Sequence, residues 1–215
     1  MNPIYAVTAC VCRILFRLWF RWRVIHPERV PREGPVILAS NHASFLDPPL
    51  IGSPLPRMVN YLARESLFRV PGIGAYLKAL HAVPVDRDGG GGTGLKAILD
   101  RLRGGGAILL FPEGTRTSDG SLLPAKAGIG LTVIKSDAPV VPVRVFGTFE
   151  AYGRSHRWPR PRPIAVKYGR PLDFSKWREE AKSCSKPRLK QVYQEVADAL
   201  MLEIGRLEAQ WDDSK

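Results

Sequence analysis

Two side chains that can carry out proton transfer lie close together near residue 45. His42 lies three residues after the apolar run 36–39, and Asp47 lies five residues further along. A histidine at the end of a buried strand sits where α/β proteins open their ligand crevices. If the chain turns into a helix between the two, the aspartate accepts a hydrogen bond from one imidazole nitrogen and leaves the other as a general base. The pair indicates base catalysis on a hydroxyl that the substrate supplies; the alternative is a helix cap beside an incidental histidine.

A second polar cluster directly follows the apolar run 107–110. Residues 111–117 read Phe-Pro-Glu-Gly-Thr-Arg-Thr, and their proline and glycine predict a turn with projecting polar side chains. Arg116 can bind a phosphate group through two parallel N–H groups, and Lys126 adds a second positive charge. The alternative is a polar loop with a Glu–Arg pair at the surface.

Arg87 follows a third apolar run, 83–85. In a parallel or mixed sheet, three strand ends can face one crevice, so we expect a base, a carboxylate and several cations to collect there. The cysteines and histidines lack the spacing of metal ligands, and the sequence predicts no metal site.

The rest of the chain predicts the elements that must position these residues. After Pro31, short apolar runs alternate with longer amphipathic stretches, which is the pattern of an α/β domain. The candidate strands are 36–40, 59–63, 81–85, 107–111, 140–146 and 164–168, and the candidate helices are 95–103, 129–136 and 189–207.

The N-terminal segment 4–25 has a different character. It is rich in apolar and aromatic residues, contains four arginines and precedes every acidic residue of the chain. On a helical wheel, one side carries Arg13, Arg17 and Arg21, and the opposite side carries Leu15, Leu18, Trp19 and Trp22. Four charges argue against a clean membrane span and favour a helix that lies in the headgroup region. The alternative is a helix docked on the protein's own core.

Composition excludes several classes of protein. The 215 residues are 45% hydrophobic and 24% charged, which excludes a disordered or fibrous chain. The net charge of +12 indicates a polyanionic partner: a nucleic acid, a phosphate-bearing substrate or an anionic membrane. We expect no nucleic acid, because the sequence contains no recognised binding motif. The three cysteines, Cys10, Cys12 and Cys184, predict no disulfide framework and a reducing compartment.

Together these motifs resemble the phospholipid/glycerol acyltransferase family, and within it the bacterial 1-acylglycerol-3-phosphate acyltransferases. Four blocks follow one another in the family's order between residues 30 and 175: Asn41-His42 through Asp47, the run that ends in Asp86-Arg87, Phe111 to Arg116, and Val140 to Val143. The chain departs from the usual pattern at His81, Thr117 and Ala125. None of these departures touches the proposed base, but they leave the identity of the acceptor open.

The resemblance implies a fold and a set of site residues. The fold is α/β, with a mixed, largely parallel sheet flanked by helices; residues 1–28 are the interfacial membrane helix and residues 29–215 the acyltransferase domain. His42 is implied as the general base and Asp47 as its orienting partner. The implied substrate-binding residues are Arg87, Glu113, Gly114, Thr115, Arg116 and Lys126, and the membrane-binding residues are Arg13, Arg17, Trp19, Arg21 and Trp22.

The implied reaction moves a fatty acyl group from an acyl carrier protein or coenzyme A thioester to the free hydroxyl of lysophosphatidic acid. No cofactor, metal or covalent acyl-enzyme is expected, and backbone N–H groups near His42 are the candidates for stabilising the oxyanion. A lipid substrate predicts a peripheral or monotopic protein at the cytoplasmic face of the cell membrane, in contact with its anionic surface. The alternatives are another lysolipid acceptor, such as a lyso-ornithine lipid or another lysophospholipid, and a non-catalytic lipid-binding protein.

Overall fold

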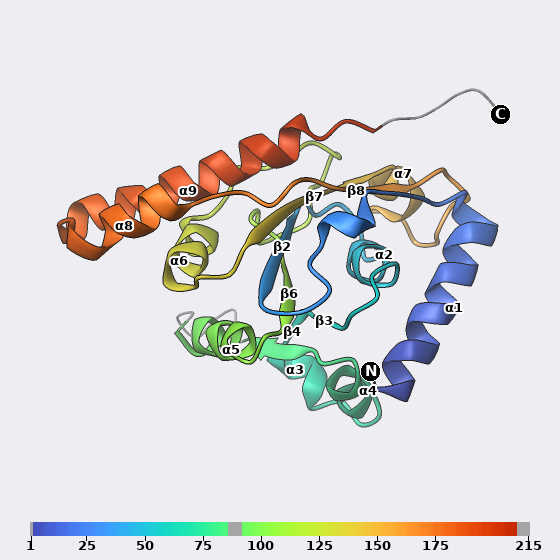
Figure 1. Ribbon diagram of the computed structural model, residues 1–215. Coiled ribbons are helices and arrows are strands. Elements are labelled where there is room, and N and C mark those ends of the chain that lie inside the picture. Colours follow the sequence, from blue (N-terminus) through green and yellow to red (C-terminus); the bar gives the residue numbers. More distant parts are fainter. Residues whose placement is uncertain (1, 86–91, 210–215) are drawn as a thin grey trace.

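A mixed sheet forms the centre of the computed structural model, which describes residues 2–85 and 92–209 (Figure 1). Within these residues six strands lie in the order β1 (Arg23–Ile25), β8 (Ala165–Tyr168), β7 (Val140–Phe146), β2 (Val36–Ser40), β6 (Ala107–Leu110) and β3 (Val59–Asn60). All neighbours pair in parallel except β7 and β8, which are antiparallel. The predicted mixed, largely parallel sheet is confirmed. A second parallel pair joins β4 (Leu62–Arg64) to β5 (Val83–Val85).

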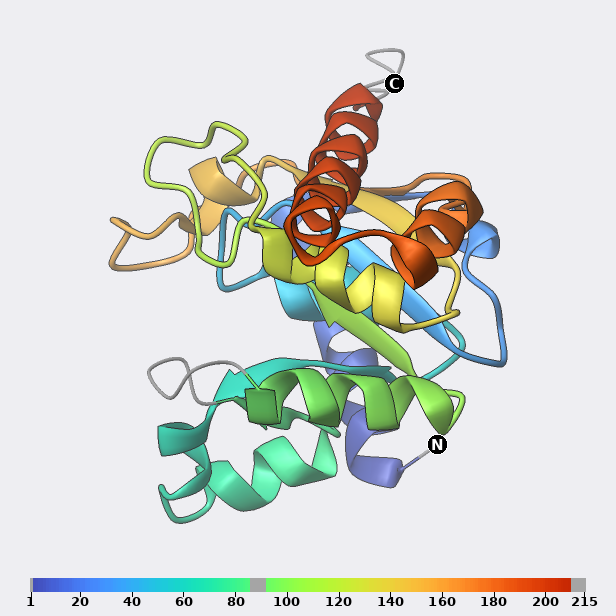
Figure 2. The same ribbon diagram turned by 90° about the vertical axis from the view of Figure 1, so that its left-hand side faces the viewer.

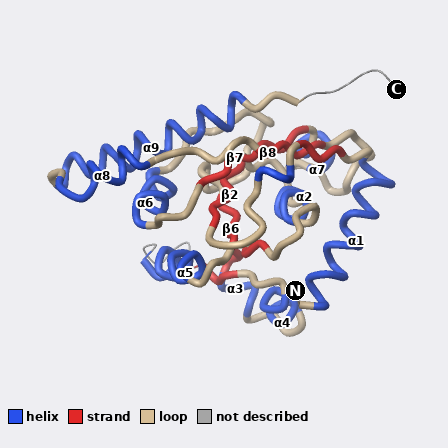
Figure 3. Tube along the Cα trace, in the orientation of Figure 1, coloured by secondary structure: helices blue, strands red, loops and turns tan. Residues whose placement is uncertain are grey.

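Helices cover both faces of the main sheet, because its buried strands send alternate side chains to opposite sides. In β2, Val36 and Leu38 enter one hydrophobic layer, and Ile37 and Ala39 enter the other. The first layer is completed by α1 (Pro3–Phe20), α2 (Asp47–Gly52) and α7 (Thr148–Tyr152). The second is completed by α5 (Gly92–Arg103), α6 (Ala127–Lys135) and α9 (Lys186–Arg206). Figure 2 shows this second layer from the front, and Figure 3 shows the strands enclosed by helices.

Short elements that the sequence pattern did not predict complete the fold. They are the 3-10 turn η1 (Pro27–Arg29) and the helices α2, α3 (Glu65–Phe68), α4 (Ile73–Ala79), α7 and α8 (Ser175–Ser183). The α3–α4 hairpin, residues 65–79, connects β4 to β5 and lies beside α1 (Figure 1). Helices of four to seven residues contain too few turns to show a hydrophobic period, which explains why α2, α3, α4 and α7 were missed.

Two strand predictions need correction. The predicted strand 59–63 is interrupted at Tyr61, and its halves enter different sheets, β3 beside β6 and β4 beside β5. The predicted strand 81–85 starts only at Val83, because His81 has a φ of 57°, which lies outside strand geometry. The end of β5 therefore belongs to the second sheet, and the three strand ends do not share one sheet edge. Arg87 lies outside the described residues.

The N-terminal helix is shorter than predicted. α1 ends at Phe20, and Arg21 adopts a left-handed φ of 45° while its N–H donates to the Phe16 carbonyl. Residues 23–25 then form β1 in the main sheet, so the predicted boundary at residue 28 falls after the first strand. Trp22 packs against the core and lies edge-on to Phe16, with ring centroids 5.6 Å apart. It is therefore not on the exposed side of the helix, where a membrane contact was expected.

α1 is docked on the core along one side, as one interpretation of this segment expected, and is exposed along the other, so contact with a membrane stays a prediction. Tyr5, Ala9, Phe16 and Phe20 are buried, and Arg13 Nε donates to the Ser53 carbonyl at 2.6 Å. The exposed large apolar side chains are Ile4, Val7, Val11, Ile14, Leu15, Leu18 and Trp19. α1 contains only two of the four arginines, Arg13 and Arg17. With 18 residues and a mean hydropathy of 1.4, it is therefore also long and apolar enough to cross a membrane.

The contact between α6 and α9 depends on a glycine. A Cβ added at Gly130 would lie 1.8 Å from the Tyr193 carbonyl oxygen, whereas one added at Gly128 would meet nothing within 4 Å. We predict that Gly130→Ala lowers the free energy of unfolding by about 1–3 kcal/mol, because the helices must separate. Gly128→Ala is expected to be neutral or to stabilise by up to about 1 kcal/mol. Urea unfolding measures both, and equal stabilities would contradict the close helix contact.

Candidate active site

Two neighbouring strands bring the main predicted residues together. β2 and β6 pair in parallel with Ala39 opposite Leu110, so the loops that carry His42 and Glu113 leave the same edge of the sheet. Two hydrogen bonds join these loops. The Thr117 N–H donates to the His42 carbonyl at 2.9 Å, and the His42 N–H donates to Glu113 Oε1 at 3.1 Å.

His42 and Asp47 form a hydrogen-bonded pair. His42 Nδ1 lies 2.8 Å from Asp47 Oδ2. A carboxylate can only accept, so Nδ1 carries the proton, and in the neutral ring Nε2 keeps its lone pair. The same Oδ2 accepts the N–H groups of Ala43 and Ser44, each at 2.7 Å. Asp47 is fully buried at the first residue of α2, and the three donors on Oδ2 compensate for part of the water that the carboxylate has lost.

The imidazole of His42 is also fixed by an aromatic ring. Phe111 stacks on it with the ring centroids 3.8 Å apart and the planes inclined by 12°. The His42 side chain is 16% exposed, so one part of the ring remains accessible. The sequence analysis did not assign Phe111 a role, although its position directly after β6, beside the strand that precedes His42, is a signal for such a contact.

Two further polar residues fix the loop that carries His42. Asn41 acts as an extra strand residue: its Oδ1 accepts the Val145 N–H at 2.9 Å and its Nδ2 donates to the Val145 carbonyl at 3.3 Å. Ser44 Oγ donates to the Tyr152 carbonyl at 2.7 Å. Their partners lie more than 100 residues away in the chain, and no local pattern predicts such contacts.

Glu113 lies beneath this loop and not on an open surface. It is 2% exposed; its Oε1 accepts the His42 N–H, and its Oε2 has no hydrogen-bond partner within the described residues. The pKa of this carboxyl is raised to about 7, mainly by burial and to a smaller extent by the negative charge of Asp47, while the hydrogen bond from the His42 N–H opposes the rise. The geometry makes Glu113 a support for the His42 backbone, whereas the sequence predicted contact with the acceptor.

The cations of the predicted acceptor site lie at the outer side of these loops. Gly114 and Thr115 are exposed, and Gly114 has a positive φ of 68°, with the Lys126 side chain lying against it. The guanidinium of Arg116 lies 3.5 Å from the centroid of the Phe45 ring, a cation–π contact. The structure therefore brings Arg116 next to the His42–Asp47 turn, because Phe45 belongs to that turn.

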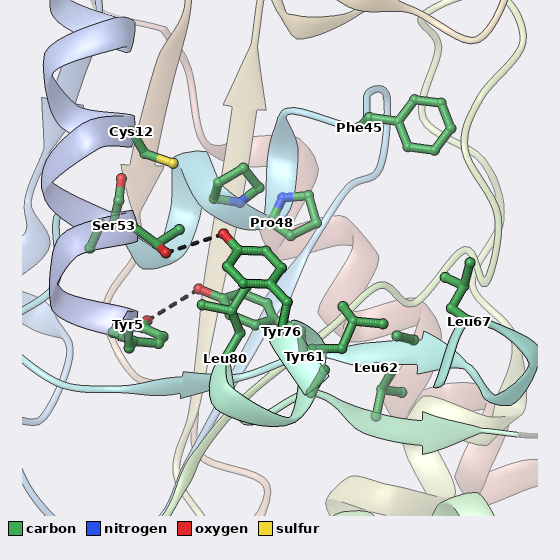
Figure 4. A pocket seen from close by; sticks show the side chains of 16 residues that line it. Tyr5, Cys12, Phe45, Pro48, Ser53, Tyr61, Leu62, Leu67, Tyr76 and Leu80 are labelled. Carbon is green, nitrogen blue, oxygen red and sulfur yellow. Dashed lines mark hydrogen bonds between the residues drawn. The ribbon is translucent and has the colours of Figure 1, made fainter. Parts of the chain in front are cut away.

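An apolar cavity of about 460 Å³ starts at the same turn. Phe45 and Leu67 lie towards one side of it in Figure 4, and Tyr5 and Cys12 of α1 lie towards the other. Within the lining, the hydroxyl groups of Tyr5 and Tyr61 are hydrogen-bonded to each other at 3.2 Å. The lining residues identified among the described part of the chain are all uncharged. A cavity of this size and character suits a hydrocarbon chain.

The predicted oxyanion donors need correction. The N–H of His42 donates to Glu113, and those of Ala43 and Ser44 donate to Asp47. Because each of these amide hydrogens already has an acceptor, these three groups do not form an oxyanion hole in this structure.

Comparisons with known proteins identify similar chains. The Acyltransferase family model matches residues 21–146. A Bacillus subtilis 1-acyl-sn-glycerol-3-phosphate acyltransferase is 31% identical over 145 residues, which cover 67% of this chain and 72% of the relative. A human 1-acyl-sn-glycerol-3-phosphate acyltransferase beta is 33% identical over 135 residues, which cover 61% of this chain and about half, 48%, of the relative. The crystal structure of the acyltransferase PlsC from Thermotoga maritima superposes with a TM-score of 0.72 over 96% of this chain and 81% of that one; at 24% identity it confirms the fold.

The raised pKa of Glu113 predicts how stability depends on pH. From about pH 4.5 to 7 the native carboxyl keeps a proton that the unfolded chain releases, so this group lowers stability as pH rises. We predict that Glu113→Gln, which keeps an acceptor oxygen for the His42 N–H, gains stability relative to the wild type over this range. Urea unfolding at several pH values measures the difference. Exposed Glu65→Gln is the control, and a pH-independent difference for Glu113→Gln would contradict the prediction.

Proposed function

Because the chain belongs to the acyltransferase family, we propose that it transfers a fatty acyl group from a thioester to the free hydroxyl of lysophosphatidic acid, which yields phosphatidic acid. One observation carries the proposal: the imidazole of His42, held through Nδ1 by Asp47, belongs to a turn whose Phe45 lines an uncharged cavity and contacts the Arg116 cation. The base, the hydrocarbon site and the cation match the hydroxyl, the acyl chain and the phosphate of such a substrate.

The proposed reaction begins with the substrate hydroxyl hydrogen-bonded to Nε2 of His42. Nε2 removes the proton as the hydroxyl oxygen attacks the thioester carbonyl, and Asp47 stabilises the imidazolium through Nδ1–H. The tetrahedral intermediate then collapses and breaks the carbon–sulfur bond. The leaving thiolate takes the proton from Nε2, which restores the neutral imidazole without a covalent acyl-enzyme.

Base catalysis accounts for only part of the rate in this scheme. A positioned general base contributes about 10²- to 10⁴-fold, so holding the two substrates in attack geometry must supply much of the remainder. Phe111, Asp47 and Glu113 act here by fixing the base before the substrate arrives. We infer no resident cofactor for this chemistry, because each proton and electron pair is already accounted for.

The proposed acceptor is recognised through its phosphate. Arg116 can donate two parallel N–H groups to phosphate oxygens, and Lys126 can add a point charge from the neighbouring side of Gly114. The relatives from Bacillus subtilis and Borreliella burgdorferi, both named 1-acyl-sn-glycerol-3-phosphate acyltransferase, support this choice of acceptor over other lysolipids. The donor is an acyl carrier protein or coenzyme A thioester; both are anionic, which suits a chain of net charge +12.

The proposed location is the cytoplasmic surface of the cell membrane. α1 packs along its own domain with one side buried and exposes apolar side chains on the other. A helix held in this way keeps the domain beside it and suits contact with the interface better than a perpendicular span. The lipid acceptor then reaches the site without leaving the bilayer completely.

Substitutions at the pair test the mechanism. We predict that His42→Ala and Asp47→Asn each lower kcat by about 10²- to 10⁴-fold, since the first removes the base and the second replaces the carboxylate that stabilises the imidazolium with a neutral amide. The assay supplies a labelled acyl thioester, on carrier protein or on coenzyme A, together with a panel of lysolipids and resolves the products. A wild-type protein that binds lysophosphatidic acid but forms no product would contradict the proposal, as would full turnover by His42→Ala. Exposed His26→Ala is the matched control.

Arg116 tests recognition of the acceptor. We predict that Arg116→Lys raises the KM for lysophosphatidic acid by about ten-fold or more, because lysine cannot donate two parallel N–H groups to one phosphate. The KM for the thioester is expected to change little. Arg103→Lys on α5, whose partner is Asp100, serves as the control. Equal effects on both substrates would contradict a role specific to the acceptor.

A further inference from the structure

The α3–α4 hairpin exposes apolar side chains that neither the core nor the proposed chemistry requires. Val70 is 41% exposed and Ile73 is 46% exposed. Leu67 and Tyr76 are exposed to a similar extent. Apolar side chains grouped on one surface element mark a site of interaction with another molecule or with a membrane.

The hairpin adjoins the exposed side of α1. Thr8 Oγ1 and the Tyr76 hydroxyl are hydrogen-bonded at 3.1 Å, and Asn2 Nδ2 donates to the Ala79 carbonyl at 3.3 Å. Each residue of a helix advances by about 100°. Thr8 therefore lies within an exposed apolar arc of about 140°, near the end of the arc that adjoins the buried side of α1. The arc is made by Ile4, Val7, Val11, Ile14, Leu15, Leu18 and Trp19. The two apolar surfaces meet at the Thr8–Tyr76 contact.

The apolar cavity lies between these two elements. α1 contributes Thr8 to its lining. The hairpin contributes Leu67 and Tyr76, which are labelled in Figure 4. Because Leu67 and Tyr76 are also exposed, the same side chains reach both the cavity and the outer surface. The structure thus joins an uncharged interior space to an apolar exterior surface.

Charge indicates which partner this surface fits. Residues 3–25 and 64–79 contain seven basic residues and one acidic residue: Arg13, Arg17, Arg21, Arg23, Arg64, Arg69, Lys78 and Glu65. Apolar side chains with surrounding cations are complementary to a bilayer that contains anionic lipids, whose headgroups attract the cations while the apolar groups enter the interface.

We infer that the α3–α4 hairpin is a second membrane-contacting element, which enters the interface of an anionic bilayer beside α1 so that an acyl chain passes between them into the cavity. The identity of that chain as part of the substrate rests on the proposed function. The contact of the hairpin with the bilayer rests on the exposed side chains, the link to α1 and the charge.

Co-sedimentation of the full chain with vesicles tests this inference. The variant is Val70→Glu/Ile73→Glu, at two positions outside the cavity lining. Vesicles contain phosphatidylcholine with or without phosphatidylglycerol. We expect the partition coefficient on the mixed vesicles to fall about ten-fold or more. Leu202→Glu, at a 56% exposed leucine on α9, is the matched control and is expected to bind as the wild type does. If the Glu variant does not fold, Val70→Ser/Ile73→Ser replaces it. We expect this Ser variant to lose less binding to the mixed vesicles than the Glu variant would.

Turnover, measured separately, distinguishes failure of this inference from failure of the proposed function. The hairpin variant is expected to lose activity on lysophosphatidic acid in vesicles and to keep it on a short-chain acceptor dissolved as monomers. Unchanged vesicle binding by the folded hairpin variants would overturn the inference, and a changed oligomeric state alongside it would identify the surface as a protein interface. A wild type inactive on both acceptors would reject the proposed function, while the vesicle result would still decide the role of the hairpin.

Discussion

The site depends on one buried oxygen atom, Oδ2 of Asp47. It accepts hydrogen bonds from the imidazole of His42 and from the backbone at Ala43 and Ser44, so the same atom sets the turn of the chain and the tautomer of the base. A fully buried carboxylate without these donors would carry a large desolvation cost. The turn and the ionised Asp47 therefore stabilise each other. The paired strands β2 and β6 then position this unit against Phe111 and Glu113, which hold the ring and the backbone of His42.

The architecture separates polar chemistry from apolar binding. The carboxyl ends of β2 and β6 carry the base, the buried carboxyls and the Arg116 cation, whereas α1, α2 and the α3–α4 hairpin enclose an uncharged space that starts at Phe45. A lysolipid has the same division, with a phosphate and a hydroxyl at one end and a hydrocarbon chain at the other. Phe45 belongs to both regions, because its ring contacts Arg116 and also lines the cavity. Under the proposed function, the orientation of the substrate follows from where the turn places this one aromatic side chain.

The sequence was informative where local pattern and tertiary structure agree. The strands around His42 and Glu113 are continuous apolar runs buried on both faces, and the bounds of β7 were predicted to the residue. The pairing of His42 with Asp47 was also predicted, although the helix begins at Asp47 itself and does not lie between the two. Features that depend on distant partners were missed. Trp22 is of a residue type typical of membrane anchors, but its ring packs edge-on against Phe16. The stacking of Phe111 on His42 follows only from the register of β2 and β6.

The most direct test of the central claim is the position of one proton. Nitrogen-15 NMR of the histidine side chains, with His42 assigned through a His42→Gln variant, reports which ring nitrogen is protonated in the neutral imidazole. The account predicts a proton on Nδ1 of His42, directed at Asp47, and an unprotonated Nε2 available to a hydroxyl. A neutral ring with its proton on Nε2 would contradict it, because that nitrogen would then have no lone pair with which to act as the base.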